Sequence, residues 1–345
     1  MSHSPMGEET SSKARFFFMR PPWRLPIWFV TGLLVGYLLW QPGTLPEDGR
    51  HDRGKNGIWI SHGWMGDDAW FARHNKNRDE YRSEASIRNL ADKLRQNHIT
   101  DVFPHLCPAL PNGKIPQVDD EQVERLVKML EGVRVIPWVG APNGDVETIY
   151  SDTRWRKRFC ESIAGLLEAH PGLAGIHVNI EPCRSGDVDF LTLLEELRAI
   201  LPKGKILSVA AYPPPTIWQP VPEIHWDEAY FREVSQRVDQ VAVMMYDTAL
   251  RWEKPYISLM AIWTREILNW SGRAEVLLGV PVYDDSGTTY HFPHVENLKN
   301  GLKGIHSGLN GFGQLPENYQ GVAIYCEWEM EPEEWKFFQK YFLKK

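Results

Sequence analysis

Short apolar runs alternate with amphipathic segments from residue 57 to the end of the chain. Eight runs have strand length and are bounded by turn residues, at 57–61, 100–105, 133–139, 175–181, 206–211, 238–247, 275–281 and 321–326. Between them apolar residues recur at helical spacing, as in Ile87, Leu90, Ala91 and Leu94. Eight strands, each followed by a helix, predict a (β/α)8 TIM barrel, an α/β fold of about 250 residues. An open doubly wound sheet is the alternative, but no glycine-rich phosphate loop follows any run.

A different pattern precedes the predicted barrel. Residues 1–24 contain basic side chains, and residues 25–40 form an apolar run of 16 residues. We expect a cytoplasmic basic tail at 1–24, a membrane signal-anchor helix at 25–40 and a linker at 41–56. The barrel at 57–345 would then lie outside the cytoplasm, in the periplasm or the extracellular space. A buried core helix is the alternative, because about 20 residues are needed to cross a bilayer upright.

Composition excludes several classes of protein. Hydrophobic residues make up 43% of the 345 positions and charged residues 24%, which is typical of a globular protein and excludes a disordered or collagen-like chain. The formal net charge of −7 disfavours a nucleic-acid partner, since phosphate binding needs a basic surface. The four cysteines form no CxxC motif, so no zinc ribbon or redox site is predicted, although a disulfide between an undetermined pair is compatible with an oxidising compartment.

The apolar run at 175–181 carries polar residues at alternate positions. Because side chains alternate along a strand, His177, Asn179 and Glu181 share one face, and in a barrel that face points into an apolar interior. Such groups are costly there unless they bind one another or a ligand. Glu181 is the last, at the mouth, where desolvation would raise its pKa as a general acid requires. The alternative is a polar plug that is fully hydrogen-bonded inside the barrel.

Three segments resemble the signatures of glycoside hydrolase family 18, which contains chitinases and related endo-β-N-acetylglucosaminidases. The signature DGxDxDxE aligns with Ala174, Gly175, His177, Asn179 and Glu181. Residues 244–247 are similar to the family's MxYD, and residues 279–283 to its GxPxY. All three lie on the expected strands in the expected order, so the resemblance spans residues 57–345.

The resemblance implies retaining, substrate-assisted hydrolysis of a β-linked N-acetylglucosamine-containing glycan. Glu181 would protonate the leaving oxygen while the sugar's own 2-acetamido oxygen attacks the anomeric carbon, so no protein nucleophile is needed. Asn179 would orient the acetamido group, and Tyr246 would donate a hydrogen bond to its oxygen. Asp247 and Tyr283 would line the pocket.

The chain also departs from the family pattern. Ala174, His177 and Asn179 stand where the family has aspartates, and residues 179–181 are similar to the Asn-Ile-Glu of the family 85 endo-β-N-acetylglucosaminidases. On the third strand, 138–141 matches the family's SxGG only in part, and Tyr325 replaces the tryptophan that floors the sugar site. The remaining substrate-binding residues that we expect are His177, Tyr325, Trp328, Trp138 and Trp64.

Tryptophan is abundant, with 15 copies. Several follow predicted strand ends, where they could stack on apolar sugar faces; these are Trp64, Trp138, Trp218, Trp226, Trp252 and Trp328. For each of them, ordinary packing under a loop is an equally good interpretation.

Two other enzymatic interpretations stay open. A two-carboxylate retaining glycosidase would pair Glu181 with Glu327, Glu329 or Asp247 about 5 Å away, although Glu327 and Glu329 could instead cap the following helix. A catalytic metal could be held by three histidines, namely His62, His105 and His177, but no HxH or HExxH spacing supports it.

A non-catalytic, lectin-like barrel is the alternative from a different class, and the presence of Glu181 argues against it. We therefore expect a glycoside hydrolase without metal or cofactor. Its expected partners are a polysaccharide or glycan substrate and, through the N-terminal segment, a membrane.

Overall fold

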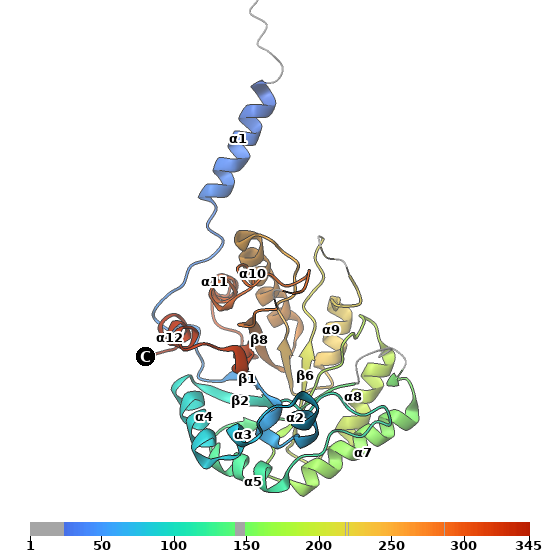
Figure 1. Ribbon diagram of the computed structural model, residues 1–345. Helices are drawn as coiled ribbons and strands as arrows, with labels where there is room; N and C mark the ends of the chain where they lie inside the picture. The colour runs from blue at the N-terminus through green and yellow to red at the C-terminus, as the bar shows by residue number, and fades with distance from the viewer. Residues whose placement is uncertain (1–23, 142–148, 218, 220, 286) are drawn as a thin grey trace, which may run out of the picture. The chain divides into compact units, whose positions relative to one another are not determined.

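The computed structural model describes residues 24–141, 149–217, 219, 221–285 and 287–345 (Figure 1). The chain divides into two compact units, Met1–Gln41 and Pro42–Lys345. The first contains helix α1 (Arg24–Leu39), whose apolar side chains from Trp28 onward are exposed. Within the described ranges, no helix is both long enough and apolar enough to cross a membrane. The membrane-spanning helix expected at 25–40 is therefore not confirmed.

The second unit is built on one sheet of parallel strands. The described strands are β1 (Asn56–Ile60), β2 (Ile99–Pro104), β3 (Arg134–Val135), β4 (Trp138–Val139), β5 (Gly175–Val178), β6 (Ile206–Ala211), β7 (Gln240–Val243), β8 (Glu275–Pro281) and β9 (Tyr319–Tyr325). Their order is β3-β2-β1-β9-β8-β7-β6-β5-β4, and every neighbouring pair is parallel. This arrangement fits the predicted (β/α)8 barrel.

The predicted third strand, 133–139, is divided into the two short strands β3 and β4. Pro137 lies between them and has no N–H to donate, so the ladder is interrupted there. The hydrogen bonds nevertheless continue on both sides: Ile136 N donates to Val102 O at 2.9 Å, and His177 N donates to Pro137 O at 2.8 Å. The two ends of the sheet thus meet on one chain segment, which closes the barrel.

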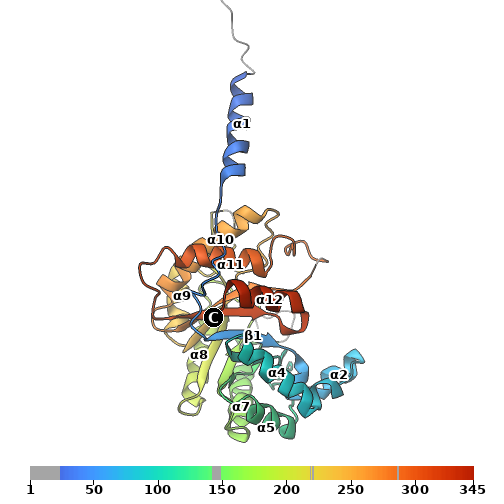
Figure 2. The same cartoon turned by 90° about the vertical axis from the view of Figure 1, so that its left-hand side faces the viewer.

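Helices follow the strands and form the outer layer (Figures 1 and 2). They are α2 (Asp68–His74), α3 (Asp79–Arg82), α4 (Glu84–Gln96), α5 (Asp120–Met129), α7 (Thr153–Ala169), α8 (Val188–Ile200), α9 (Glu228–Ser235), α10 (Glu253–Trp270), α11 (Leu298–Leu309) and α12 (Pro332–Tyr341), with the short 3-10 helices η1 (His62–Met65) and η2 (Glu327–Glu329). Side-chain caps begin many of them; Asp119, Asp152, Asp187 and Asp227 each accept a hydrogen bond from a first-turn N–H. The apolar stripe predicted on α4 is buried against the sheet.

A row of hydrogen-bonded polar side chains fills the barrel interior below its mouth. Trp59 Nε1 donates to His177 Nε2 at 3.2 Å, which leaves Nδ1 to donate to Ser208 Oγ at 2.8 Å. Ser208 donates in turn to Gln240, whose amide donates to Asp101. Burial lowers the pKa of His177 to about 3, so the imidazole is neutral, as this tautomer requires. The prediction that His177 points into the barrel is confirmed. Both of its ring nitrogens are hydrogen-bonded to protein side chains, however, so it does not contact the pocket as a substrate-binding residue.

The barrel unit begins before residue 57, because part of the expected linker at 41–56 packs on it. His51 and His306 are both buried, with their Nδ1 atoms 2.6 Å apart. Asp52 Oδ2 lies 2.6 Å from His98 Nδ1. The segment is therefore part of the fold and not a free tether.

All four cysteines are free, so the disulfide considered from the sequence is not present. Cys160, Cys183 and Cys326 are buried, whereas Cys107 lies beside the mouth and its thiol donates to Trp138 O at 3.3 Å.

Candidate active site

A pocket of about 340 Å³ opens at the carboxyl ends of the strands. All of the expected site residues except His177 and Trp64 line it. The lining residues among them are Asn179, Glu181, Tyr246, Asp247, Tyr283, Tyr325, Trp328 and Trp138. His177 lies in the interior, and Trp64 is buried in η1, where its Nε1 donates to Glu327 Oε2 at 3.4 Å. Hollows of about 980 and 770 Å³ exist elsewhere, but neither contains Glu181.

Glu181 follows β5 and presents its carboxyl to the pocket. Asn179 Nδ2 donates to Glu181 Oε1 at 2.7 Å, and the Tyr212 hydroxyl also donates to this carboxyl. Solvent reaches the residue, yet protein atoms surround the carboxyl closely. Desolvation raises the pKa of Glu181 and the negative charge of Asp247 adds to the rise, while the two hydrogen bonds act in the opposite direction. The net increase favours a protonated carboxyl that can serve as a general acid.

Asn179 is held in place through its backbone and its amide nitrogen. Its backbone N–H donates to Val139 O at 2.8 Å. A Cβ atom on Gly140 would lie 2.0 Å from Asn179 O, so the two chain segments can approach this closely only because residue 140 is glycine. With Nδ2 bonded to Glu181, the buried Oδ1 has no hydrogen-bond partner among the residues that the structure describes. An orphaned buried acceptor of this kind is suited to a donor on a ligand.

Aromatic rings form the floor and wall of the pocket. Tyr325 is at their centre: its ring stacks on Tyr246 at 5.4 Å and makes edge contacts with Trp59, Tyr283 and Trp328. Burial raises the pKa of Tyr246 well above its usual value, so its hydroxyl stays protonated and can donate a hydrogen bond.

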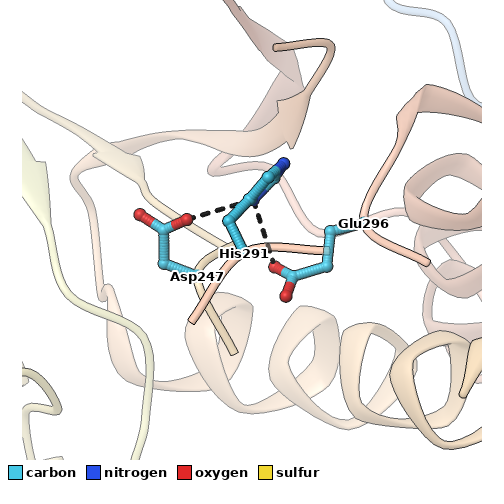
Figure 3. A group of neighbouring side chains, drawn as sticks. All are labelled: Asp247, His291 and Glu296. Carbon is cyan, nitrogen blue, oxygen red and sulfur yellow. Dashed lines mark hydrogen bonds and ion pairs between the residues drawn. The ribbon is translucent and has the colours of Figure 1, made fainter. Parts of the chain in front are cut away.

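Asp247 is oriented by a network that includes His291 and, beyond it, Glu296 (Figure 3). It has a left-handed backbone, with φ of 60°, which Asp tolerates better than most residues. The Tyr283 hydroxyl donates to Asp247 Oδ1, and His291 Nδ1 lies 3.1 Å from the same oxygen. The other ring nitrogen of His291, Nε2, is 3.1 Å from the backbone oxygen of Tyr283, which can only accept a hydrogen bond. Both ring nitrogens of His291 therefore act as donors.

With both ring nitrogens donating, His291 is an imidazolium, and it lies between the carboxyl groups of Asp247 and Glu296. Burial lowers the pKa of His291, but the hydrogen bond to Asp247 and the charge of Glu296 outweigh this and raise the pKa overall. Glu296 is fully buried, with Oε2 3.9 Å from His291 Nδ1, and it accepts hydrogen bonds from Thr248 N and Oγ1. Burial raises the pKa of Glu296 to about 7.

The same three residues are the only group within the described ranges whose ligand atoms, all within 4.8 Å of one another, could hold a metal ion. Hydrogen bonds and ion pairs inside the group account for its close packing, so we conclude that its role is to orient the Asp247 carboxylate. The histidine trio considered from the sequence does not converge: the His62 and His105 rings are 3.6 Å apart, whereas His177 is bonded to Trp59 and Ser208.

We expect His291→Gln to lower the free energy of unfolding at neutral pH by about 1–3 kcal/mol, because Glu296 loses its counter-charge and Asp247 loses a donor. Urea denaturation measures this value. The exposed His294 offers a matched control, and His294→Gln should stay within about 0.5 kcal/mol of the wild type. Equal stabilities of the two variants would contradict the assigned network.

Several lining residues were not predicted from the sequence. Trp59 could have been, because it alternates with Ile58 and Ile60 on β1 and so faces inward. Asp284, Asp285 and Tyr290 lie in the segment between β8 and α11, where no periodic pattern indicates direction.

Two other tryptophans considered as stacking residues, Trp226 and Trp252, do not line the pocket. Trp226 is buried and its Nε1 donates to Cys183 O, and Trp252 is exposed just before α10. Trp218 lies outside the described residues.

Comparison with known proteins gives a consistent result. The model of the family "Glycosyl hydrolases family 18" matches residues 80–294. The fold is similar to the spore cortex-lytic enzyme SleL of Bacillus cereus, with a TM-score of 0.57, 13% identity, and 84% of this chain and 74% of that chain covered. It is also similar to a chitinase from Chromobacterium violaceum, with a TM-score of 0.54, 15% identity, and 84% and 99% covered. A comparison with curated protein sequences finds no match.

Proposed function

The chain belongs to glycosyl hydrolase family 18 and is a glycoside hydrolase, and from this premise we propose that it cleaves β-linked N-acetylglucosamine-containing glycans with retention of configuration. One observation carries the proposal. A carboxyl with a raised pKa, that of Glu181, lies beside the amide oxygen of Asn179, which is buried and has no partner within the described part of the chain. A proton donor next to a free acceptor suits an acetamido sugar better than a plain hexose.

In the proposed reaction Glu181 gives its proton to the glycosidic oxygen, and the bond from that oxygen to the anomeric carbon breaks. The acetamido oxygen of the same sugar forms the new bond to the anomeric carbon, which yields an oxazolinium ion. Asn179 Oδ1 accepts the acetamido N–H, and Tyr246 donates to the acetamido oxygen and so holds it in line for attack. Glu181, now a carboxylate, then deprotonates the water that opens the ion.

The amide of Asn179 raises the question whether this residue acts as the asparagine of family 85 does or in place of the family 18 carboxylate. Family 18 has a carboxylate there, whereas family 85 pairs an asparagine with its acid, and the resemblance of residues 179–181 to family 85 stays a prediction. The bond from Asn179 Nδ2 to Glu181 Oε1 supports it, because it leaves only the acceptor end of the amide free for substrate.

Hydrolysis through two protein carboxylates is the second candidate. Asp247 and Glu329 line the pocket together with Glu181, while Glu327 is bonded to Trp64 and does not. Both candidate nucleophiles have other partners, however: Asp247 accepts from Tyr283 and His291, and Glu329 accepts from Asp284 N at 2.9 Å. These contacts favour the substrate-assisted route. The prediction that Glu327 and Glu329 cap the following helix is wrong: Glu331 is the N-cap of α12 and forms a capping box with Glu334.

The test of the proposed function is incubation of the full chain with a glycan panel, with products identified by mass spectrometry. The panel contains chitin oligosaccharides, peptidoglycan, an N-glycan core and a β-linked exopolysaccharide of N-acetylglucosamine. We expect cleavage beside N-acetylglucosamine in at least one of them. A panel without any cleavage, obtained with folded protein, would contradict the proposal.

Asp247→Asn should move the alkaline limb of the pH profile of kcat/KM to lower pH. Glu181 must be protonated to act as an acid, so the rate falls as pH rises through its pKa. Removing the negative charge of Asp247 removes one cause of the raised pKa of Glu181, which then loses its proton earlier. Asp285→Asn is the control, because Asp285 is not among the charges that act on Glu181. An unchanged limb in Asp247→Asn would show that another group controls the profile.

We also propose that the segment at 25–40 associates the chain with a membrane and that the barrel lies outside the cytoplasm. The exposed apolar side chains of α1 and the basic residues before it support this location. Membrane fractionation of the full chain is the test; release of the protein by a low-salt wash alone would contradict the association.

A further inference from the structure

Carboxyl groups surround the mouth of the pocket. Glu181, Asp247, Asp284, Asp285 and Glu329 line it, and no lining residue in the described part of the chain is Lys or Arg. The positions of this unit that the structure does not describe, 142–148, 218, 220 and 286, contain no Lys or Arg either. The cation that contacts Asp247, His291, is buried below the pocket and does not line it.

The acidic lining continues into a neighbouring hollow of about 680 Å³. This hollow shares Tyr283, Asp284, Trp328 and Glu329 with the pocket. It adds the acidic residues Glu296, Glu331 and Glu334, again without Lys or Arg among its described lining residues. Trp328 lines both hollows and is 40% exposed, so a ligand that passes from one hollow to the other can contact its ring. The two hollows together form a groove, which we call the acidic groove.

The negative charges in this groove act on the residues around them. Tyr290, an exposed lining residue, has its pKa raised by burial and by the charges of Asp247, Asp285 and Glu181. Every charged group brought into the groove would meet the field of the ionised carboxylates, to which Glu181 does not contribute while it holds the catalytic proton. A cationic ligand is attracted and an anionic one is repelled, with an effect that salt screens over about 10 Å at 0.1 M.

An independent observation also indicates that the pocket is shaped for a ligand. Trp138 is 7% exposed and lines the pocket, and its Nε1 has no acceptor among the residues that the structure describes. A buried indole N–H without a partner is costly, and an acceptor oxygen on a bound sugar would satisfy it.

We propose that the acidic groove selects glycans in which de-N-acetylated, positively charged glucosamine units stand beside the N-acetylglucosamine that is cleaved, and that it rejects glycans bearing carboxylates. This inference rests on the proposed function. The cleaved sugar keeps its acetamido group, because that group is the nucleophile. The ammonium group therefore belongs to a neighbouring sugar, which stacks on Trp328 with its charge beside Glu329.

The test compares two β-linked substrates of equal length with the full chain. One is a fully N-acetylated chitin oligosaccharide, and the other is the same oligosaccharide after partial de-N-acetylation. At about 0.05 M salt we expect kcat/KM to be about 3- to 10-fold higher for the second substrate, and at about 1 M salt, where the screening length is about 3 Å, we expect this advantage to disappear. Glu329→Gln should reduce the low-salt ratio to near unity.

Glu161→Gln is the matched control, since Glu161 is an exposed residue of α7 that pairs with Lys157 and should leave the ratio unchanged. A ratio at or below unity at low salt, with the acetylated substrate still cleaved, would overturn the inference and leave the proposed function standing. Cleavage of neither substrate would overturn both. A binding arm uses Glu181→Gln and fully de-N-acetylated oligosaccharide in calorimetry; affinity that does not weaken with salt would also overturn the inference.

Discussion

Replacement of Glu181 by glutamine is expected to lower kcat by about 10³-fold or more, because the amide has the shape of the carboxyl but has no proton to give to the leaving oxygen. The hydrogen bond from Asn179 Nδ2 can be retained, since the glutamine oxygen also accepts it. Binding should therefore persist while turnover is lost. Steady-state kinetics and calorimetry with the same N-acetylated oligosaccharide measure the two quantities.

The control for this variant is Glu327→Gln. Glu327 lies just after the end of β9, outside the pocket, and accepts a hydrogen bond from Trp64. It should keep kcat within about twofold of the wild type. Turnover close to that of the wild type in Glu181→Gln would exclude Glu181 as the acid, and an equal loss of activity in Glu327→Gln would show that the loss does not report on the acid.

Replacement of Asn179 by alanine is expected to lower kcat by about 10²- to 10³-fold, a loss typical of removing one group that stabilises charge in a transition state. The variant removes both the acceptor for the acetamido N–H and the donor that holds Glu181 Oε1 at 2.7 Å. Because the lost contacts orient the attacking oxygen, the effect should fall on kcat more than on KM. Single-turnover kinetics separates the chemical step from product release.

Asn179→Asp distinguishes the amide from the carboxylate that family 18 has at this position. In this chain an aspartate would place a second negative charge beside Glu181 and lose the amide donor, so we expect a rate below that of the wild type. An unchanged or higher rate would show that catalysis does not require the Asn179 amide. The resemblance of residues 179–181 to family 85 would then not extend to the mechanism.

The barrel could be predicted from the sequence because its strands are apolar runs of strand length and each is followed by a helix with a clear apolar stripe. The division of the third strand was not predicted, although Pro137 carried the signal: a residue without N–H interrupts a ladder. The packing of His51 against His306 was also missed, because a polar residue in a stretch rich in Pro and Gly gives no local sign of burial.

The site was predictable where side chains lie on a strand or directly after it. Asn179 and Glu181 lie just beyond the end of β5 and continue its alternation, which also places His177 inward, but alternation does not tell how deep a residue lies. His177 is one strand step below the mouth and finds Trp59 and Ser208 as partners from other strands. The loop residues Asp284, Asp285 and Tyr290 and the pair His291 and Glu296 come together only through the tertiary fold.

The central claim is that the substrate's own acetamido group is the nucleophile. The most direct test compares the rate of hydrolysis of a β-linked N-acetylglucosamine oligosaccharide with that of its glucose counterpart, which lacks the 2-acetamido group. We predict cleavage of the first only, with inhibition by a thiazoline analogue of the oxazolinium ion. Cleavage of the glucose oligosaccharide at a comparable rate would contradict the account and require a nucleophile on the protein.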